Sequence, residues 1–398
     1  MAGDTITTFW GEFLMQPTPL EASFNWCSHN CAYCFANLNK PDRAADLKAT
    51  ENLLEKFQNR KTIEAKLLQQ GYGVLISNRV DPFATSNYRE AVPIMRRMTE
   101  LNIPIAIQTK GGKGIDEALS FLKPSCWYIT ITTLNDDIRR QIEPGAPSID
   151  SRFELIEKLT ALGHVVYVGL NRWTAEWCPL NEAKALLQRA KDCGAFGVWT
   201  EVLHFNWKQV RNMPDRDKAA IGETVIKRAS KRSHDPIEFD QWIELQQAAR
   251  EIGLEVFSMN QGDRSNYFEP YKTLYPKSFE TLQGFINRCH DTELGQRLIS
   301  FEDFASVILP TLPEGVLNVG HYVGATAHAF CKQEGWSNWM TYSDLLKILW
   351  QHPKIKGSPA RAACFAYAAK NGESLLDAEG LPYLVFNANG FTDYYTEV

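Results

Sequence analysis

Long apolar runs are missing from this chain of 398 residues. No stretch of about 18 apolar residues occurs, so we expect no membrane-spanning helix. Segment 1–9 also lacks a basic stretch followed by an apolar run, so we expect no signal peptide and a cytoplasmic location. Positive charge is not in excess either. The formal net charge is −5, which excludes a general polycation and confines any nucleic-acid surface to a local patch.

Cysteine is scarce as well. The chain has nine, an odd number and too few for a disulfide scaffold, and a reducing cytoplasm keeps thiols free for metal binding or chemistry. Most of them are scattered without a close pair, which argues against a second metal cluster and makes buried free cysteine their default interpretation. The scattered residues are Cys126, Cys178, Cys193, Cys289, Cys331 and Cys364.

Short apolar strands alternate with amphipathic helices over residues 20–205. The expected strands are Leu20–Trp26, Gly73–Asn78, Ile103–Thr109, Trp127–Thr133, Val165–Leu170 and Gly197–Leu203. The expected helices between them are Thr62–Gln70, Asn87–Leu101, Ser151–Leu162 and Asn181–Cys193. Such β–α units in series predict an α/β fold with a parallel sheet, either open or closed into a partial TIM-like (β/α)6 barrel.

The C-terminal part has a different rhythm. A helix over Phe239–Ile252 and a strand over Leu254–Met259 extend the barrel, and Pro- and Gly-punctuated segments follow. We expect helices at Phe279–Cys289, Phe301–Leu309, Tyr342–Trp350 and Ala360–Lys370, then a strand pair, Ser374–Leu376 and Tyr383–Phe386. This order is compatible with a winged-helix module and equally with an irregular cap. We therefore predict an N-terminal extension (1–19), a barrel (20–265) and a mainly helical C-terminal substrate or cap region (266–398).

Three cysteines follow the first expected strand at spacing C-x3-C-x2-C: Cys27, Cys31 and Cys34. Thiolates are the protein ligands of iron–sulfur clusters, and three ligands on a four-iron cube leave one iron open for a substrate or cofactor. Zinc would require a fourth ligand in a paired pattern, which His29 alone does not supply. A disulfide would leave one thiol over, and a degenerate barrel that only binds ligands would not need an open cluster.

This cysteine loop, with Tyr33 just before its last cysteine, resembles the signature of the radical S-adenosylmethionine (SAM) superfamily. The resemblance implies a 4Fe-4S cluster whose open iron chelates SAM. It also implies reductive cleavage of SAM to a 5′-deoxyadenosyl radical that abstracts hydrogen from the substrate. Tyr33 would lie against the adenine, and a flavodoxin or ferredoxin would donate the electron.

Later motifs resemble the spore photoproduct lyase branch of that superfamily. They are Ser77–Pro82, Thr109-Lys110, Thr130–Thr133, Glu143–Pro147 and Arg152. The resemblance covers about half of the chain, residues 20–205. Members of that branch use a cysteine near the second strand as hydrogen donor, but Gly73–Asn78 contains none, which puts photoproduct repair itself in doubt.

Polar side chains fall at the expected strand ends, where ligands bind in parallel sheets and barrels. Lys110 can pair a carboxylate, and Ser77 or Asn78 can accept from an ammonium group. Arg152 either reaches this site or lies on an exposed helix surface. Ribose or adenine contacts are expected from Thr132, Thr133, Asn171 and Glu201. Each of these groups has an alternative role in capping or loop hydrogen bonds.

Two substrate classes remain open. The first is a nucleic-acid base, in DNA modification or repair or in RNA, with a thymine methyl or its substituent as a sensible target. It is suggested by the branch resemblance and by a basic stretch flanked by Phe205 and Trp207, because cations neutralise phosphates and aromatics stack on bases. Its candidate contacts are Lys208, Arg211, Lys227, Arg228, Lys231 and Arg232. The same stretch also fits a solvated helix. The second class is a small molecule or peptide, with the C-terminal region as a lid.

Overall fold

The computed structural model describes residues 6–8, 13–24, 26–39, 47–231, 235–258, 261–319, 324–355 and 357–398. Two compact units divide the chain. Unit 1 comprises residues 1–6, 21–56 and 74–257, and unit 2 comprises residues 7–20, 57–73 and 258–398. Two N-terminal segments thus cluster with the C-terminal region, which a linear reading of the chain does not anticipate. In the described part of the chain, no helix is long and apolar enough to cross a membrane.

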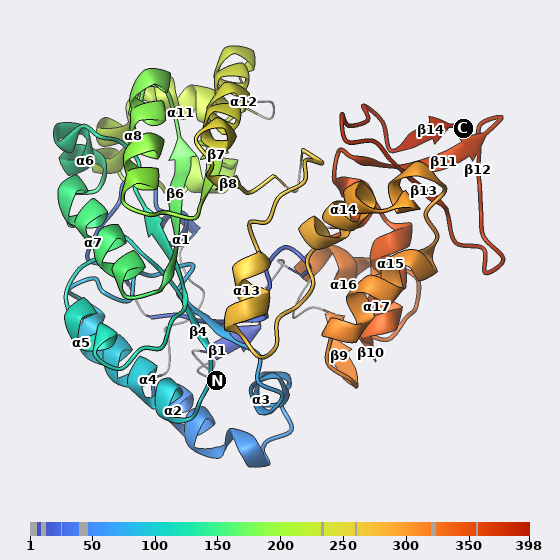
Figure 1. The fold of residues 1–398 in the computed structure, drawn as a ribbon, viewed down its shortest axis with the longest axis horizontal. Helices are drawn as coiled ribbons and strands as arrows, with labels where there is room; N and C mark the ends of the chain where they lie inside the picture. The colour runs from blue at the N-terminus through green and yellow to red at the C-terminus, as the bar shows by residue number, and fades with distance from the viewer. Residues whose placement is uncertain are drawn as a thin grey trace. The chain divides into compact units, whose positions relative to one another are not determined.

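An eight-stranded sheet forms the framework (Figure 1). Its spatial order follows the chain from β1 to β8, and every pairing from β3 to β8 is parallel. The strands are β1 (Ile6–Thr8), β2 (Leu20–Ala22), β3 (Val74–Ile76), β4 (Ile105–Thr109), β5 (Cys126–Thr130), β6 (Val165–Trp173), β7 (Gly197–Val202) and β8 (Glu255–Val256). The predicted α/β class and partial barrel are confirmed. The segment expected to be only an extension contributes the edge strand β1.

Helices cover the outer face of these strands, as Figure 1 shows for α4 to α8. The helices of this region are α1 (Phe35–Asn39), α2 (Leu47–Lys56), α3 (Ile63–Gln69), α4 (Tyr88–Glu100), α5 (Ile115–Leu119), α6 (Asp136–Ile142), α7 (Ile149–Ala161), α8 (Leu180–Asp192), α9 (Trp207–Asn212), α10 (Asp215–Ile221), α11 (Glu223–Ala229) and α12 (Pro236–Glu251). Side-chain caps fix several starts, such as Ser148 before α7 and Asp235 before α12. The basic stretch, for which a solvated helix was one interpretation, forms three short helices, α9 to α11, which are separated at Pro214 and Gly222.

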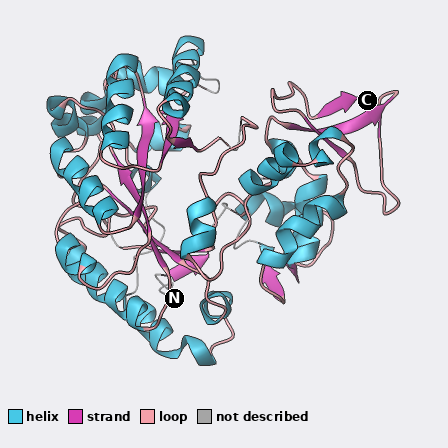
Figure 2. Cartoon of the chain, viewed as in Figure 1, coloured by secondary structure: helices cyan, strands magenta, loops and turns pink. Residues whose placement is uncertain are grey.

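Unit 2 carries helices α13 (Glu269–Leu274), α14 (Leu282–Asp291), α15 (Phe301–Ile308), α16 (Gly324–Gln333) and α17 (Tyr342–Gln351). It also carries β9 (Val316–Asn318), β10 (Trp339–Thr341), β11 (Phe365–Lys370), β12 (Glu373–Ser374), β13 (Leu384–Phe386) and β14 (Tyr395–Glu397). Figure 2 shows these strands (magenta) among the helices. β9 pairs with β10, whereas β11 pairs with β12, β13 and β14 in a separate sheet.

The helix predicted over Ala360–Lys370 is wrong. A single 3-10 turn, Pro359–Arg361, is followed by strand β11. Its alanines have high helix propensity, but Phe365 to Ala369 are all buried and the strand is hydrogen-bonded on both sides. Tertiary pairing thus overrides local preference.

Candidate functional site around the cysteine loop

The cysteine loop, residues 26–35, is folded by its own backbone. Asn30 N donates to Cys27 O (3.3 Å) and Cys34 N donates to Cys31 O (3.1 Å). Asn30 has φ +53°, a left-handed conformation that asparagine tolerates. Two successive turns therefore shape the short loop that carries the three thiols.

Serine side chains tie this loop to the segment after β3. Ser28 N donates to Ser86 Oγ (3.1 Å), and Ser86 N donates to Ser28 Oγ (3.2 Å). Ser86 Oγ also donates to Trp26 O (3.1 Å). These hydrogen bonds thus hold together two loops that are about 60 positions apart in the sequence.

His29 and Asp81 form a second anchor. His29 Nε2 lies 3.1 Å from Asp81 Oδ2, and His29 Nδ1 lies 3.0 Å from Gly145 O. Asp81 also accepts from Thr109 Oγ1 (2.7 Å) and Lys110 N (2.6 Å) at the end of β4. Burial alone would raise the pKa of Asp81, but His29 and these hydrogen bonds hold it below the usual value. Asp81 is therefore the ionised link between the cysteine loop and β4.

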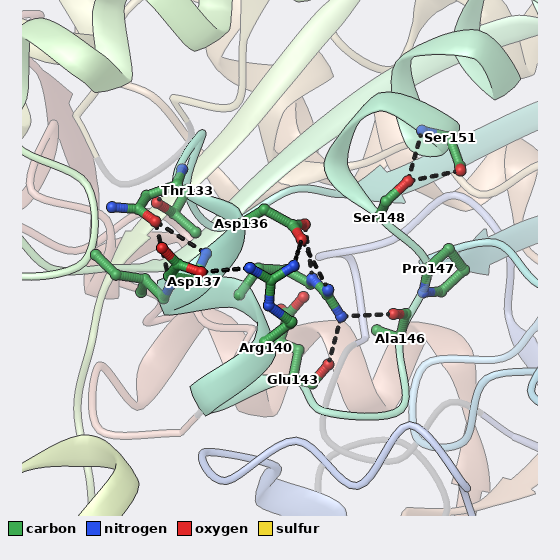
Figure 3. A network of polar contacts seen from close by, with 12 residues as sticks. Thr133, Asp136, Asp137, Arg140, Glu143, Ala146, Pro147, Ser148 and Ser151 are labelled. Atoms are coloured by element: carbon green, nitrogen blue, oxygen red, sulfur yellow. Dashed lines mark hydrogen bonds and ion pairs between the residues drawn. The ribbon is translucent and has the colours of Figure 1, made fainter.

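The loop at residues 143–147 packs directly on the cysteine loop. Gly145 N donates to His29 O (2.9 Å), and a Cβ at Gly145 would lie 2.1 Å from Ser28 O, so only glycine fits. Arg139 on α6 donates to Ala146 O (3.0 Å) and pairs with Asp136. Figure 3 shows this network around Asp136, Glu143 and Ala146.

The three thiols are in electrostatic contact. Burial raises the pKa of Cys27 to about 12, and Asp81 and Cys34 add to the rise. Burial also raises the pKa of Cys31, with further contributions from Cys34 and Cys27. These thiols therefore stay protonated unless a cation stabilises the thiolates, as a bound metal does.

The donor set fits an iron–sulfur cluster, whose protein ligands are thiolates. No three His, Cys, Asp or Glu side chains among the described residues are grouped as they would be around one metal ion. A four-iron cube places each thiolate on a different iron, so it requires wider spacing than a zinc site does. The three thiols of this loop are the donor type that such a cube requires, one for each of three irons.

A buried carboxylate, Glu143, gathers the polar groups behind the cysteine loop. Glu143 Oε2 lies 2.5 Å from Arg152 Nη2, and both side chains are fully buried. Glu143 Oε1 accepts from Thr132 Oγ1 (3.0 Å) and from the Tyr33 hydroxyl, and lies 3.7 Å from Lys110 Nζ. Burial opposes ionisation, yet Arg152 and Lys110 lower the pKa of Glu143 to about 2.

Four predicted site residues therefore meet at a residue that was not predicted as part of the site. Tyr33, Lys110, Thr132 and Arg152 all contact Glu143. The exposed alternative for Arg152 is wrong, since its side chain is fully buried. Sequence offered one signal for Glu143, its place in the motif Glu143–Pro147, but a lone glutamate in a loop does not show that it is buried.

The other predicted residues have separate environments. Ser77 Oγ accepts from Arg79 N (3.3 Å) and Val80 N (3.2 Å). Thr133 Oγ1 donates to Glu182 (2.8 Å), next to the start of α6. Both hydroxyls thus have the local hydrogen-bonding roles given above as the alternative to cofactor contact.

The remaining predicted contacts have fewer hydrogen bonds within the described part of the protein than Ser77 and Thr133 have. They are Asn78, Asn171 and Glu201. Asn78 and Asn171 are half-buried. Asn171 is the Cα partner of Glu201 across β6 and β7, and its side chain interacts with the Tyr128 side chain. Glu201 lies 3.6 Å from His204 Nδ1. An amide and a carboxylate side by side at the strand ends are suited to the hydroxyl or amino groups of a ligand.

Arg172 is a further residue that the sequence did not single out. The β6–β7 register shifts between Asn171 and Trp173, and Arg172 has φ +132°, which a residue with a Cβ rarely adopts. The bulge directs its guanidinium to within 5.7 Å of the Phe35 ring centroid, next to Cys34. Bulges of this kind often re-aim a side chain beside an active site.

The predicted basic contacts differ in availability. Arg228 is paired with Glu176 and Glu238, so its charge is already compensated. Lys208, Arg211, Lys227 and Lys231 are exposed, whereas Arg232 lies outside the described residues. Arg211 stacks on Trp207, with 4.8 Å from its guanidinium carbon to the ring centroid.

Comparison with known proteins identifies the domain. Residues 22–177 match the family model described as the radical SAM superfamily. No curated protein matches the chain in sequence. Similar solved structures include spore photoproduct lyase complexed with a dinucleoside spore photoproduct, at 13% identity, a TM-score of 0.45, and 60% of this chain and 76% of that chain covered.

Two further structures show the breadth of the similarity. SuiB of Streptococcus suis has 13% identity and a TM-score of 0.38, and covers 59% of this chain and 47% of its own. Methylornithine synthase has 13% identity and a TM-score of 0.37, with 59% and 63% covered. These values are too low to choose among substrates. Residues 22–177 therefore form a radical SAM domain, and enzymes with this domain use a 4Fe-4S cluster and SAM.

Proposed function

We propose that this radical SAM enzyme abstracts hydrogen from a nucleic-acid base, in DNA modification or repair. Cys27, Cys31 and Cys34 would hold the cluster. Cluster and SAM together supply the hydrogen-abstracting chemistry, after reduction by a flavodoxin- or ferredoxin-type donor. A thymine methyl, or a substituent on it, is the target that we favour.

The observation that carries this proposal is a surface beside the cysteine loop, formed by Trp207, Lys208 and Arg211 and called here the α9 surface. Trp207 is 71% exposed, an unusual position for a tryptophan, and Arg211 lies over its ring. Helix α9 packs on α1, which directly follows Cys34, and Asn212 Nδ2 donates to Leu38 O (3.0 Å). An exposed aromatic ring next to cations is suited to stack on a base while the cations pair with its phosphate.

The chain's residues also support a division of roles toward SAM. Lys110 and Arg152 already face Glu143, so we propose that they orient Tyr33 and the strand ends, with Lys110 also within reach of a carboxylate. Asn78, Asn171 and Glu201 keep polar atoms for the ligand's ammonium or ribose. Ser77, Thr132 and Thr133 would then shape the site through their hydrogen bonds. A base in a duplex would have to be flipped out to reach it.

One experiment tests the radical chemistry and a second tests the substrate. The reconstituted, reduced enzyme should convert SAM to 5′-deoxyadenosine, and a Cys31→Ala variant should not. A fluorescence-anisotropy titration at low salt should show binding of mixed oligonucleotides. Trp207→Ala should weaken this binding by about 1–3 kcal/mol, whereas Trp339→Ala, an exposed tryptophan of unit 2, should not. Absence of oligonucleotide binding at low salt would reject the base and favour a small-molecule or peptide substrate.

A further inference from the structure

Unit 2 contains a pocket outside the radical SAM domain. Its volume is about 380 Å³, at the lower end of the roughly 300–1,000 Å³ typical of ligand pockets. The lining comes from segments far apart in sequence, around α16, the end of α17 and strands β11 to β14. The pocket is therefore a product of tertiary structure, and no motif of the chain marks it.

Half of the residues that line it carry aromatic rings. Phe330 lies 5.9 Å from Trp336 and 3.9 Å from His352, measured between ring centroids. Tyr367 and Tyr395 are Cα partners of β11 and β14, with ring centroids 5.4 Å apart. Two aromatic groups thus line one pocket.

The pocket has a fixed base and an open rim. Tyr367 is buried, and its hydroxyl donates to Trp350 O (2.6 Å), which immobilises the ring. Trp336 and Tyr395 are 46% and 56% exposed. Large aromatic side chains exposed around a concavity are typical of binding sites, because a bound ligand removes their apolar surface from water.

The charge of the wall is negative. Among the described lining residues, Glu334 is the single fully charged side chain, and no lysine or arginine is present. Burial lowers the pKa of His352 more than Glu334 raises it, which favours the neutral imidazole. Aromatic faces are themselves electronegative, so rings and carboxylate together attract a cation and disfavour a phosphate.

We propose that this pocket binds an arginine side chain presented by a peptide segment of a partner protein. A planar guanidinium stacks on aromatic rings and pairs with a carboxylate, which the compact ammonium group of lysine does less well. The methylene stem of arginine would pack on Leu376 and Pro382, which also line the pocket. This inference does not depend on the proposed substrate of the radical SAM domain.

The test is a titration of the reconstituted full chain with a short Gly/Ser peptide that carries one central arginine. Binding is measured by calorimetry and by tryptophan fluorescence. Saturable binding is expected. Glu334→Gln and Trp336→Ala should each weaken it by about three- to tenfold, the size expected for loss of one cation–π or charge contact. Trp339→Ala is the matched control, because Trp339 is 59% exposed, close in sequence and not part of the lining.

Three outcomes would overturn the proposal. One is no saturable binding of the arginine peptide at millimolar concentration. Another is equal affinity for a peptide with glutamine in place of arginine. The third is an equal loss in the Trp336→Ala and Trp339→Ala variants. Displacement of the arginine peptide by single-stranded DNA from a Trp207→Ala enzyme would assign the pocket to nucleic acid instead and likewise overturn it.

Discussion

At the scale of single residues, a buried carboxylate is the centre of the network of polar contacts behind the cysteine loop. Glu143 compensates the fully buried Arg152 and the nearby Lys110, and it accepts hydrogen bonds from Tyr33 and Thr132. Leaving a buried cation without its partner is much more costly than losing an exposed ion pair. Glu143 therefore has a structural role, and the predicted cofactor contacts bonded to it take part in the same buried network.

Replacing Glu143 by glutamine should destabilise unit 1 strongly. We expect Glu143→Gln to lower the free energy of unfolding by about 3–5 kcal/mol, because the charge of Arg152 stays buried without a counterion. Urea denaturation at pH 7 measures this loss. Lys158→Ala, which breaks an exposed pair with Asp116, is the control and should cost no more than about 1 kcal/mol. Equal losses in the two variants would contradict the role of Glu143.

The same pair predicts a pH dependence. The pKa of Glu143 is lowered from 4.5 to about 2, so its ionised form is favoured by folding. Its contribution is complete above the unfolded pKa near 4.5 and is lost as the pH falls toward 2. The difference in unfolding free energy between wild type and Glu143→Gln should therefore shrink over this window, as urea titrations at several pH values would show. A constant difference would mean that Glu143 is not ionised in the folded enzyme.

Gly145 should be required for cluster assembly. A methyl group there would lie 2.1 Å from Ser28 O, so Gly145→Ala must displace the loop that carries the cysteines. We expect less iron per chain after reconstitution, measured by iron analysis and cluster absorbance. Gly163→Ala, at a strained helix end without neighbours within 4 Å of the added methyl, controls for general destabilisation. Full iron content in Gly145→Ala would show that the loop tolerates the shift.

At the scale of elements, helix α11 contains two kinds of basic residue. Lys227 is exposed, whereas Arg228 is 20% exposed and paired with Glu176 and Glu238. Arg228 thus joins α11 to α12 and to the segment after β6. Lys227 remains available to bind an anionic partner.

Substitutions on α11 should separate these roles. Lys227→Ala should weaken oligonucleotide binding without changing stability, since an exposed phosphate contact contributes only to binding. Arg228→Ala should lower the unfolding free energy, because it leaves Glu238 buried without its cation. Anisotropy and urea denaturation of both variants provide the test. A loss of binding without a loss of stability in Arg228→Ala would contradict this assignment.

At the scale of the whole molecule, a net charge of −5 opposes general attraction of nucleic acid. Binding would then depend on the exposed basic residues Lys208, Arg211, Lys227 and Lys231. If all of them contact phosphates of a single strand, the slope of log affinity against log salt is about −3, from roughly 0.7 per phosphate. A salt series with a single-stranded oligonucleotide measures it. A slope near zero would exclude phosphate contacts by these residues.

Much of the barrel could be predicted because its signals are local. Consecutive apolar residues in β3 to β7 and helical periodicity in α4, α7 and α8 reflect burial that each segment needs wherever it packs. β11 is the counterexample. Its alanine-rich sequence favours a helix by itself, and only pairing with β12, β13 and β14 makes it a strand.

For the site, the sequence alone revealed the cysteine triad and, through it, the radical SAM resemblance, since the three cysteines lie within eight residues of one loop. The tertiary structure decided what the other polar residues do. It brought Tyr33, Lys110, Thr132 and Arg152 to Glu143, and it paired Arg228 with acidic partners. The physical reason is that a buried ion pair depends on residues distant in the chain, and only the folded packing fixes which charges meet and which remain free.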